Sequence, residues 1–326
     1  METVSGSSNW KLIIRREQDG VTLVRAVTCD ARAALPDTLF GLPVTALGNH
    51  ALSPTAWAET GEEVLVTCGP LAAEPEWNNR NLRDLTLPAG LKRVGDCTFL
   101  NCGGLQTLRL HDCIEFWGGS SLTNCRALNT IYLTRTNGQG ISLAHFAEEI
   151  SRELDITVQD GDQVTRLIFP EYEESDEEDF IAQAIQFSYH ISGAGYLHHH
   201  CFHQKKLTLK DYDDLWPGYL RMHHDNGCAV RLAWWRLRYP TELTEKAEAG
   251  YLAYLRAHTA EAAAWLLAEK DTPGLSFLLE RTEPDRDTLS AACAAAREAG
   301  ASEALALLLE EQHRRFPAGL DKTFDL

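Results

Sequence analysis

A 23-residue repeat that starts at Leu82 constrains the fold of this chain more than any other feature. One copy reads LRDLTLPAGLKRVGDCTFLNCGG, and the next, from Leu105, reads LQTLRLHDCIEFWGGSSLTNCRA. A third copy begins at Leu128 with LNTIYLT and then degrades. The aligned apolar sets are Leu82, Leu105 and Leu128; Leu85, Leu108 and Ile131; and Leu87, Leu110 and Leu133. Apolar matches at a fixed period are typical of a solenoid, in which each coil buries its inner face against its neighbours.

The later part of each copy also matches. Phe99 aligns with Leu122, and the pair Asn101-Cys102 aligns with Asn124-Cys125. An Asn amide or a small thiol can satisfy backbone groups inside the bend where a coil turns back. Because packing alone produces such a column, we interpret the two cysteines as structural rather than as metal or redox groups.

The motif L-x-x-L-x-L-P-x-x-L-x-x-V-G-x-x-x-F-x-N-C, from Leu82 to Cys102, resembles the BspA-like leucine-rich repeats of many bacterial proteins. An imperfect copy, GLPVTALGNHAL at Gly41–Leu52, is similar to the lead-in unit of such arrays. The resemblance covers about Leu35–Leu133. It implies a binding protein, often displayed at the cell surface.

The predicted fold class is therefore α+β, with a short leucine-rich-repeat solenoid followed by a mainly α-helical domain. Four segments are expected: an N-terminal capping hairpin at 1–34, turning at Asp19-Gly20; the solenoid at 35–140; a connecting helix and hairpin at 141–170; and an acidic helical domain at 171–326. The last segment has the alanine- and leucine-rich pattern of helical repeats such as ankyrin, without their signature motif.

Each L-x-L stretch predicts a strand whose alternate side chains face inward. The residues that lie between these leucines should then form an exposed column, and we expect them to bind a partner: Asp84, Thr86, Thr107, Arg109, Thr130 and Tyr132. Arg109 and Tyr132 lie at its centre, and both residue types are enriched among interface hot spots. The alternative is that the helical domain packs over this column.

The helical spacing of apolar residues predicts that most of the second half of the chain is α-helical. A capping box at Ser175-x-x-Glu178 predicts that helix begins at Phe180, although the acidic run Glu171–Asp179 could instead bind a partner. The other predicted helices are Ser142–Leu154, Tyr251–Leu267, Gly274–Leu279, Thr288–Ala299 and Ser302–Gln312.

Two clusters of residues suggest a possible metal site and a possible nucleic-acid-binding site. His198, His200, Cys201 and His203 are weak candidates for a metal site, because consecutive residues on a strand or helix do not converge on one ion. Trp234-Trp235, near several arginines, could stack on nucleic acid, but the apolar neighbours favour a buried helix face.

The net charge and the cysteine content limit the classes of partner and the cellular location that we expect. Residues 1–140 carry 12 positive and 14 negative charges, a net −2, so the remaining 18 positive and 33 negative charges give residues 141–326 a net −15. This excess disfavours nucleic acid and anionic membranes. The nine cysteines are an odd number, and neither a secretory signal nor a membrane span is visible, which predicts a cytoplasmic location.

The leading hypothesis is a non-enzymatic, cofactor-free interaction or scaffold module of a bacterial cell that binds another protein. One alternative is a surface adhesin-like repeat protein, which would need an export signal or anchor. The other is a metal-binding protein or enzyme that uses the His198–His203 cluster.

Overall fold

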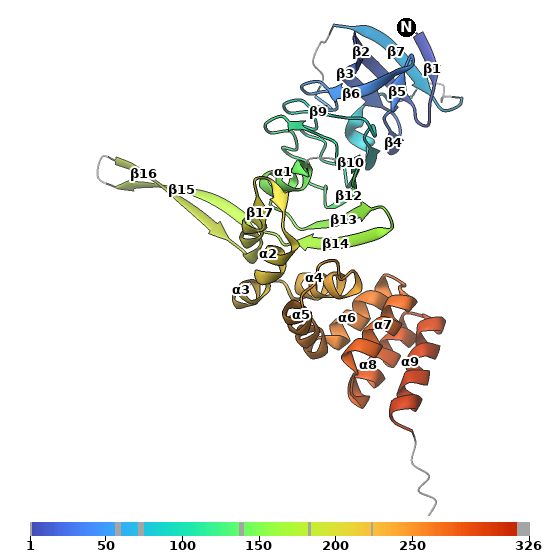
Figure 1. The fold of residues 1–326 in the computed structure, drawn as a ribbon, viewed down its shortest axis with the longest axis vertical. Helices are drawn as coiled ribbons and strands as arrows, with labels where there is room; N and C mark the ends of the chain where they lie inside the picture. Colours follow the sequence, from blue (N-terminus) through green and yellow to red (C-terminus); the bar gives the residue numbers. More distant parts are fainter. Residues whose placement is uncertain are drawn as a thin grey trace, which may run out of the picture. The chain divides into compact units, whose positions relative to one another are not determined.

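The computed structural model describes residues 2–55, 60–70, 75–136, 140–181, 184–222 and 224–317, and within these the side chains of 174–190 are outside the description. The chain divides into two units, Met1–His223 and His224–Leu326 (Figure 1). Unit 1 contains the strands, and unit 2 is helical.

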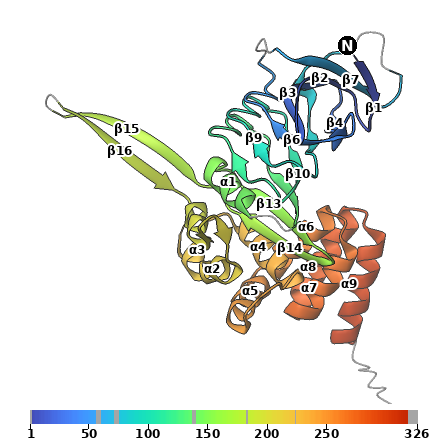
Figure 2. The same ribbon diagram turned by 45° about the horizontal axis from the view of Figure 1, so that its top comes forward.

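An eight-stranded sheet forms one side of unit 1, in the order β1-β7-β2-β3-β6-β9-β11 with β5 paired to β6. Its strands are β1 (Glu2–Ser5), β2 (Trp10–Glu17), β3 (Gly20–Thr28), β5 (Thr38–Leu39), β6 (Leu42–Leu47), β7 (Glu62–Thr67), β9 (Arg93–Val94) and β11 (Phe116–Trp117). The hairpin expected at Asp19-Gly20 is confirmed, because β2 and β3 pair antiparallel around it. Figures 1 and 2 show β3, β6 and β9 following one another in this sheet.

A six-stranded sheet forms the other side, in the order β14-β13-β12-β10-β8-β4. Its strands are β4 (Arg32–Ala34), β8 (Asp84–Thr86), β10 (Thr107–His111), β12 (Thr130–Thr134), β13 (Leu154–Asp160) and β14 (Gln163–Phe169). The 23-residue register is confirmed, because Leu108 pairs with both Leu85 and Ile131 in parallel ladders. The chain passes from β8 to β9 in the other sheet and back to β10, so the repeat contributes to both sheets.

The repeated apolar residues fill the space between the two sheets. Leu85, Leu108 and Ile131 are fully buried, and Val94 and Phe99 are buried with them. Burying a leucine or phenylalanine side chain contributes about 1.5–3 kcal/mol relative to leaving it exposed, so the strands are held by this shared core.

The cysteine column satisfies backbone carbonyls, as expected, whereas the asparagine amides contact each other and Thr55, and the asparagine column is explained by its backbone angles. Asn101 and Asn124 adopt left-handed backbone angles, with φ of 65° and 61°, which Asn tolerates better than most residues. The Cys102 thiol donates to the Leu52 carbonyl at 3.3 Å, and the Cys125 thiol donates to the Phe99 carbonyl at 3.2 Å. Burial raises the pKa of Cys125 to about 12, so this thiol is inert at neutral pH.

The expected fold class is wrong. The structure is α/β, with parallel and antiparallel strands mixed in the same sheets and helices besides, rather than an α+β chain of a leucine-rich-repeat solenoid and a helical domain. In the eight-stranded sheet β2 pairs antiparallel with β3 and β7, whereas β3 pairs parallel with β6. Of these strands only β6 lies in the imperfect copy at Gly41–Leu52, whereas β2, β3 and β7 lie outside the repeat, and a repeat period carries no information about their pairing.

The helix expected from Phe180 is also wrong. Residues Glu173–Ile181 and Ala184–Ser192 form the antiparallel strands β15 and β16, so Ser175 and Glu178 cap no helix. The sequence AIQFSYHIS alternates apolar and polar residues, and that period of two is typical of a strand. The acidic side chains from Glu174 to Asp179 lie outside the described residues, so the partner-binding alternative for them stays a prediction.

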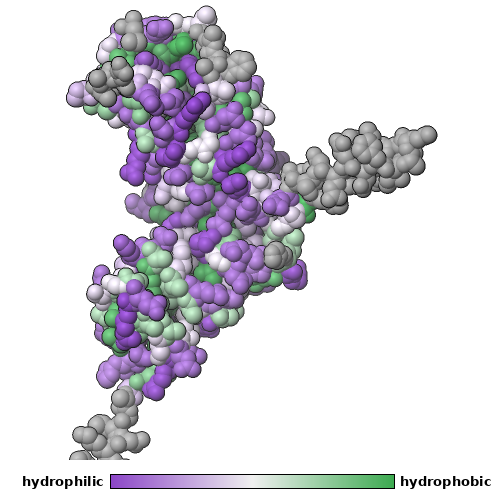
Figure 3. Space-filling model, turned by 180° about the vertical axis from the view of Figure 1, so that it is seen from behind, coloured by the Kyte–Doolittle hydropathy of each residue, from purple (hydrophilic) through white to green (hydrophobic). Residues whose placement is uncertain are grey.

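Unit 1 also contains helical elements. They are α1 (Ile141–Glu149), the 3-10 helix η2 (Ala194–Cys201), α2 (Leu209–Asp214) and α3 (Trp216–Arg221), and β17 (Phe202–His203) pairs with β18 (Lys206–Leu207). A further 3-10 turn, η1, spans Asn79–Asn81. On the face that Figure 3 shows, hydrophilic residues cover most of the described surface of unit 1.

Unit 2 consists of helix pairs packed side by side. Its helices are α4 (Asn226–Arg238), α5 (Glu245–Ala257), α6 (Thr259–Ala268), α7 (Thr272–Thr282), α8 (Arg286–Glu298) and α9 (Ser302–Arg315). α4, α6 and α8 neighbour one another in one layer, while α5, α7 and α9 belong to the other. The stretch expected as one helix from Tyr251 to Leu267 is two, α5 and α6, separated at His258.

The same kind of turn joins α6 to α7 and α8 to α9, and the two turns are 30 residues apart. The Asp271 N–H donates to the Leu266 carbonyl at 2.9 Å, and the Ala301 N–H donates to the Ala296 carbonyl at the same distance. The residue before each donor is left-handed: Lys270 with φ of 58° and Gly300 with φ of 65°. This is the geometry that commonly ends a helix, and its repetition agrees with the helical-repeat pattern in the sequence.

Trp234 and Trp235 lie on a buried face of α4, as the apolar neighbours suggested. Trp234 is fully buried, and its ring meets the Phe277 ring at 5.5 Å between centroids. Trp235 meets Trp265 edge-on at 5.7 Å. These rings therefore pack α4 against α6 and α7. Within the described part of the chain, no helix has both the length and the apolar character to cross a membrane.

Candidate functional site

The six residues of the predicted binding column lie together on the outward face of the six-stranded sheet. Arg109 pairs with Thr86 on one side and Tyr132 on the other, and Thr107 pairs in the same way with Asp84 and Thr130. All six side chains are half-buried, while the leucines between them are buried. The residues therefore form two short rows across β8, β10 and β12.

Arg109 is the centre of these rows and is held from two sides. Its Nε and Nη2 donate to the two carboxylate oxygens of Asp84, each at 3.2 Å. Its guanidinium carbon lies 4.1 Å from the centroid of the Tyr132 ring. The Arg109 side chain keeps 42% of its surface exposed. An exposed ion pair contributes about 0–1 kcal/mol to stability and an exposed cation–π contact about 0.5–1 kcal/mol. These contacts therefore orient the arginine more than they stabilise the fold.

The rows continue onto β13 and β14, which the sequence interpretation did not include. Tyr132 pairs with Thr157, and Thr157 pairs with Arg166 on β14. The Arg166 Nη2 donates to Asp155 at 2.6 Å, which is a second arginine–aspartate pair on this sheet. The turn residues around Gly161 indicated the β13–β14 hairpin in the sequence. The paired residues of β12 and β13 are 25 rather than 23 residues apart, so the repeat period did not predict that these strands extend the sheet.

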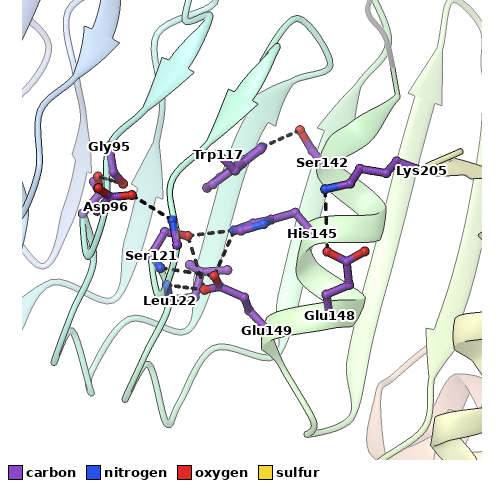
Figure 4. Close-up of polar contacts among 12 residues, drawn as sticks. Gly95, Asp96, Trp117, Ser121, Leu122, Ser142, His145, Glu148, Glu149 and Lys205 are labelled. Carbon is purple, nitrogen blue, oxygen red and sulfur yellow. Dashed lines mark hydrogen bonds and ion pairs between the residues drawn. The ribbon is translucent and has the colours of Figure 1, made fainter.

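A second polar cluster lies at the other sheet, where the repeat ends (Figure 4). The Ser121 hydroxyl is 2.7 Å from His145 Nε2, and the Glu149 carboxylate is 3.7 Å from the same nitrogen. The His145 ring stacks on Trp117 with centroids 4.7 Å apart, and the Trp117 indole donates to Ser142 at 3.2 Å. Three of these residues come from α1, so the helix holds the cluster against the last coil.

Glu149 supplies the hydrogen-bond acceptor that a further coil would have provided. In the preceding coil the Phe99 N–H donates to the Ser121 carbonyl at 2.8 Å. The equivalent donor one repeat later is the Leu122 N–H, and it donates to Glu149 Oε2 at the same distance. The Ser121 N–H donates to Oε1 at 3.3 Å. The α1 carboxylate therefore closes the end of the repeat.

This cluster is built for packing rather than for nucleophilic catalysis. Ser121 is fully buried, and His145 is 7% exposed. Desolvation, with a smaller contribution from Lys205, lowers the pKa of His145 to about 4. A general base works best with a pKa near the ambient pH, and a nucleophile must reach its substrate, so neither requirement is met. Sequence reasoning missed the cluster, although the i,i+4 spacing of His145 and Glu149 was visible.

The four residues considered as weak candidates for metal ligands lie in different environments. His198 is 2% exposed and packs among aromatic rings, including Tyr212 at 5.2 Å between centroids. The buried Cys201 thiol donates to the His198 carbonyl at 2.8 Å. His200 and His203 are exposed, and His203 contacts Asp211 at 2.8 Å. Among the described residues, no group of three or more His, Cys, Asp or Glu side chains is arranged to hold an ion.

Comparison of this chain with protein-family models, with curated proteins and with solved structures finds no match. The resemblance to BspA-like leucine-rich repeats rests on the motif residues alone and stays a prediction.

Proposed function

We propose that this chain is a non-catalytic protein-binding module that recognises its partner through the outward face of the six-stranded sheet. The observation that supports this most is the fixed position of Arg109 between Asp84 and Tyr132, on strands whose inner leucines are fully buried. A side chain already held in one geometry loses less conformational entropy on binding, so such a group strengthens recognition.

The chemistry of the face suits a protein partner. Arginine and tyrosine combine a large contact area with directed hydrogen bonds, and they dominate interface hot spots. Threonines flank them at Thr86, Thr107 and Thr130, and these offer hydroxyl groups at a regular spacing. The net charge of −17 disfavours nucleic acid as the partner.

The bacterial cytoplasm is the proposed location. All nine cysteines are free thiols in the structure, which suits a reducing compartment. The motif resemblance to bacterial repeat proteins supports the bacterial setting and a binding role.

Site-specific photocrosslinking in cells tests the proposal. A benzophenone amino acid is placed at Tyr132 on the proposed face, and a matched one at Phe116, which is 43% exposed on the other sheet. We expect one discrete crosslinked protein from position 132 and none of the same mass from position 116. Crosslinks of equal yield at both positions, or none at 132, would contradict the proposed face.

A further inference from the structure

A hollow of about 350 Å³ lies in unit 1 at the bend that contains Asn101, and none of the residues of the proposed binding face lines it. It is lined by Pro54, Thr55, Arg80, Asn101, Gly103 and Gly104. The hollow is therefore made by a loop, by η1 and by the turn that follows the Asn101-Cys102 pair.

The hollow exists because a glycine interrupts a column of arginines. The turns that lead to Leu82, Leu105 and Leu128 close with equivalent hydrogen bonds, from their N–H groups to the carbonyls of Asn79, Cys102 and Cys125. The next residue in each turn is Arg80, Gly103 and Arg126, respectively. Gly103 thus occupies the place that carries an arginine in the coil on either side, and its missing side chain leaves the space open.

Arg80 lines the hollow, and Arg126 lies at the equivalent turn position one coil beyond Gly103, outside the lining. Arg80 and Arg126 are both exposed, and neither forms an ion pair within the described part of the chain. By contrast, Arg16 pairs with Glu62, and Arg109 pairs with Asp84. Two arginines without an ion pair to any described residue, in turns on either side of Gly103, are unusual for a chain with a net charge of −17, because carboxylates are abundant.

The lining adds hydrogen-bond donors. The N–H groups of Gly103 and Gly104 have no hydrogen-bond partner among the described residues. The side-chain oxygen Oδ1 of Asn101 already accepts from Asn124 Nδ2 at 2.8 Å, whereas the side-chain nitrogen Nδ2 of Asn101 makes only a long contact of 3.5 Å with the Thr55 hydroxyl. The groups left for a ligand are therefore mostly donors and cations.

We propose that this hollow binds an oxyanion, a carboxylate or phosphate group, against Arg80 and the backbone of Gly103 and Gly104, with Arg126 one coil beyond Gly103 as a second source of positive charge. The planar guanidinium group donates paired charge-assisted hydrogen bonds to two oxygens of either a carboxylate or a phosphate group. Glycine is required because a longer side chain at position 103 would fill the space the anion takes. The proposal is independent of the binding face on the six-stranded sheet.

NMR titration of the full chain with two probes tests this site. Inorganic phosphate and acetate are added separately at constant ionic strength, and the amide signals of Gly103 and Gly104 are followed. We expect saturating shifts of both signals with at least one probe. Saturation by phosphate alone assigns the site to phosphate groups, and saturation by acetate alone assigns it to carboxylates.

Two variants make the test specific. Gly103→Leu should abolish saturation at the Gly104 signal; the backbone tolerates it, because φ is in the ordinary range and an added Cβ meets its nearest atom at 3.6 Å. Arg80→Gln with Arg126→Gln should weaken binding at least tenfold, whereas Arg15→Gln, an exposed control on β2, should not change it. Shifts that never saturate with either probe, or equal affinities in all variants, would overturn the proposal.

Discussion

Replacement of Glu149 by alanine should destabilise unit 1 far more than the same change at the adjacent Glu148. The Glu149 carboxylate accepts hydrogen bonds from the N–H groups of Ser121 and Leu122, two residues that are at most 2% exposed. A buried donor left without a partner costs about 1–3 kcal/mol. Partial entry of water would offset some of this, so we expect a loss of roughly 2–4 kcal/mol.

Glu148 is the matched control because it shares the same helix and the same change in helix propensity. Its side chain is 53% exposed and lies 3.9 Å from Lys205. Such an exposed pair contributes about 0–1 kcal/mol, so Glu148→Ala should change the stability of unit 1 very little. The stability of the Glu149→Gln variant should lie between those of the two alanine variants, because the amide keeps one acceptor oxygen.

The assay must report unit 1 alone. Alkylation of the buried thiols Cys102 and Cys125 across a urea series, read by mass spectrometry, follows the unfolding of that unit. The urea midpoint should fall clearly for Glu149→Ala and stay within error of wild type for Glu148→Ala. Equal midpoints for the two alanine variants would refute the assignment of Glu149 as the group that closes the repeat.

Three further predictions concern the core, the thiols and pH. Leu108→Ala should destabilise unit 1 by about 2–5 kcal/mol in the same assay, because Leu108 is fully buried between Leu85 and Ile131, and an unchanged midpoint would refute its burial. Rapid alkylation at lysis should find nine free thiols, and a consistent deficit of two or more would indicate a disulfide in the cell. Burial lowers the pKa of His145 and of His198 to about 4, below the ordinary 6.5, so the unfolded chain binds more protons between these values and unit 1 should lose stability as pH falls from 6.5 to 4. Each histidine can contribute up to about 3 kcal/mol, and His198→Gln should flatten the loss; an unaltered pH dependence would contradict the buried neutral state.

The local register of the repeat could be predicted from the sequence. Leu85, Leu108 and Ile131 are spaced by the period itself, and the same spacing sets the strand pairing of β8, β10 and β12. The six residues of the proposed binding face followed directly, because side chains alternate along a strand. The hairpin at Gly20 was also predictable from its turn residues.

The fold class could not be predicted from the same signal. Arg32 pairs with Asp84 across 52 residues, and β1 pairs with β7, with no shared sequence pattern to announce either contact. The run of carboxylates before Phe180 looked like a helix start because acidic residues favour helix N-termini. The period-two alternation of the residues that follow predicts the strand β16 instead. The Glu149 contacts were hidden for a similar reason, since they join a helix to a repeat that had already ended.

The affinity of the crosslinked partner for the double variant Arg109→Ala with Tyr132→Ala tests the central claim most directly. Both side chains are half-exposed, so their removal should leave the circular dichroism spectrum and the urea midpoint of unit 1 unchanged. We predict that binding weakens at least tenfold relative to wild type, while a Phe116→Ala control binds as wild type does. An unchanged affinity in the double variant, with the fold intact, would contradict recognition through the face of the six-stranded sheet.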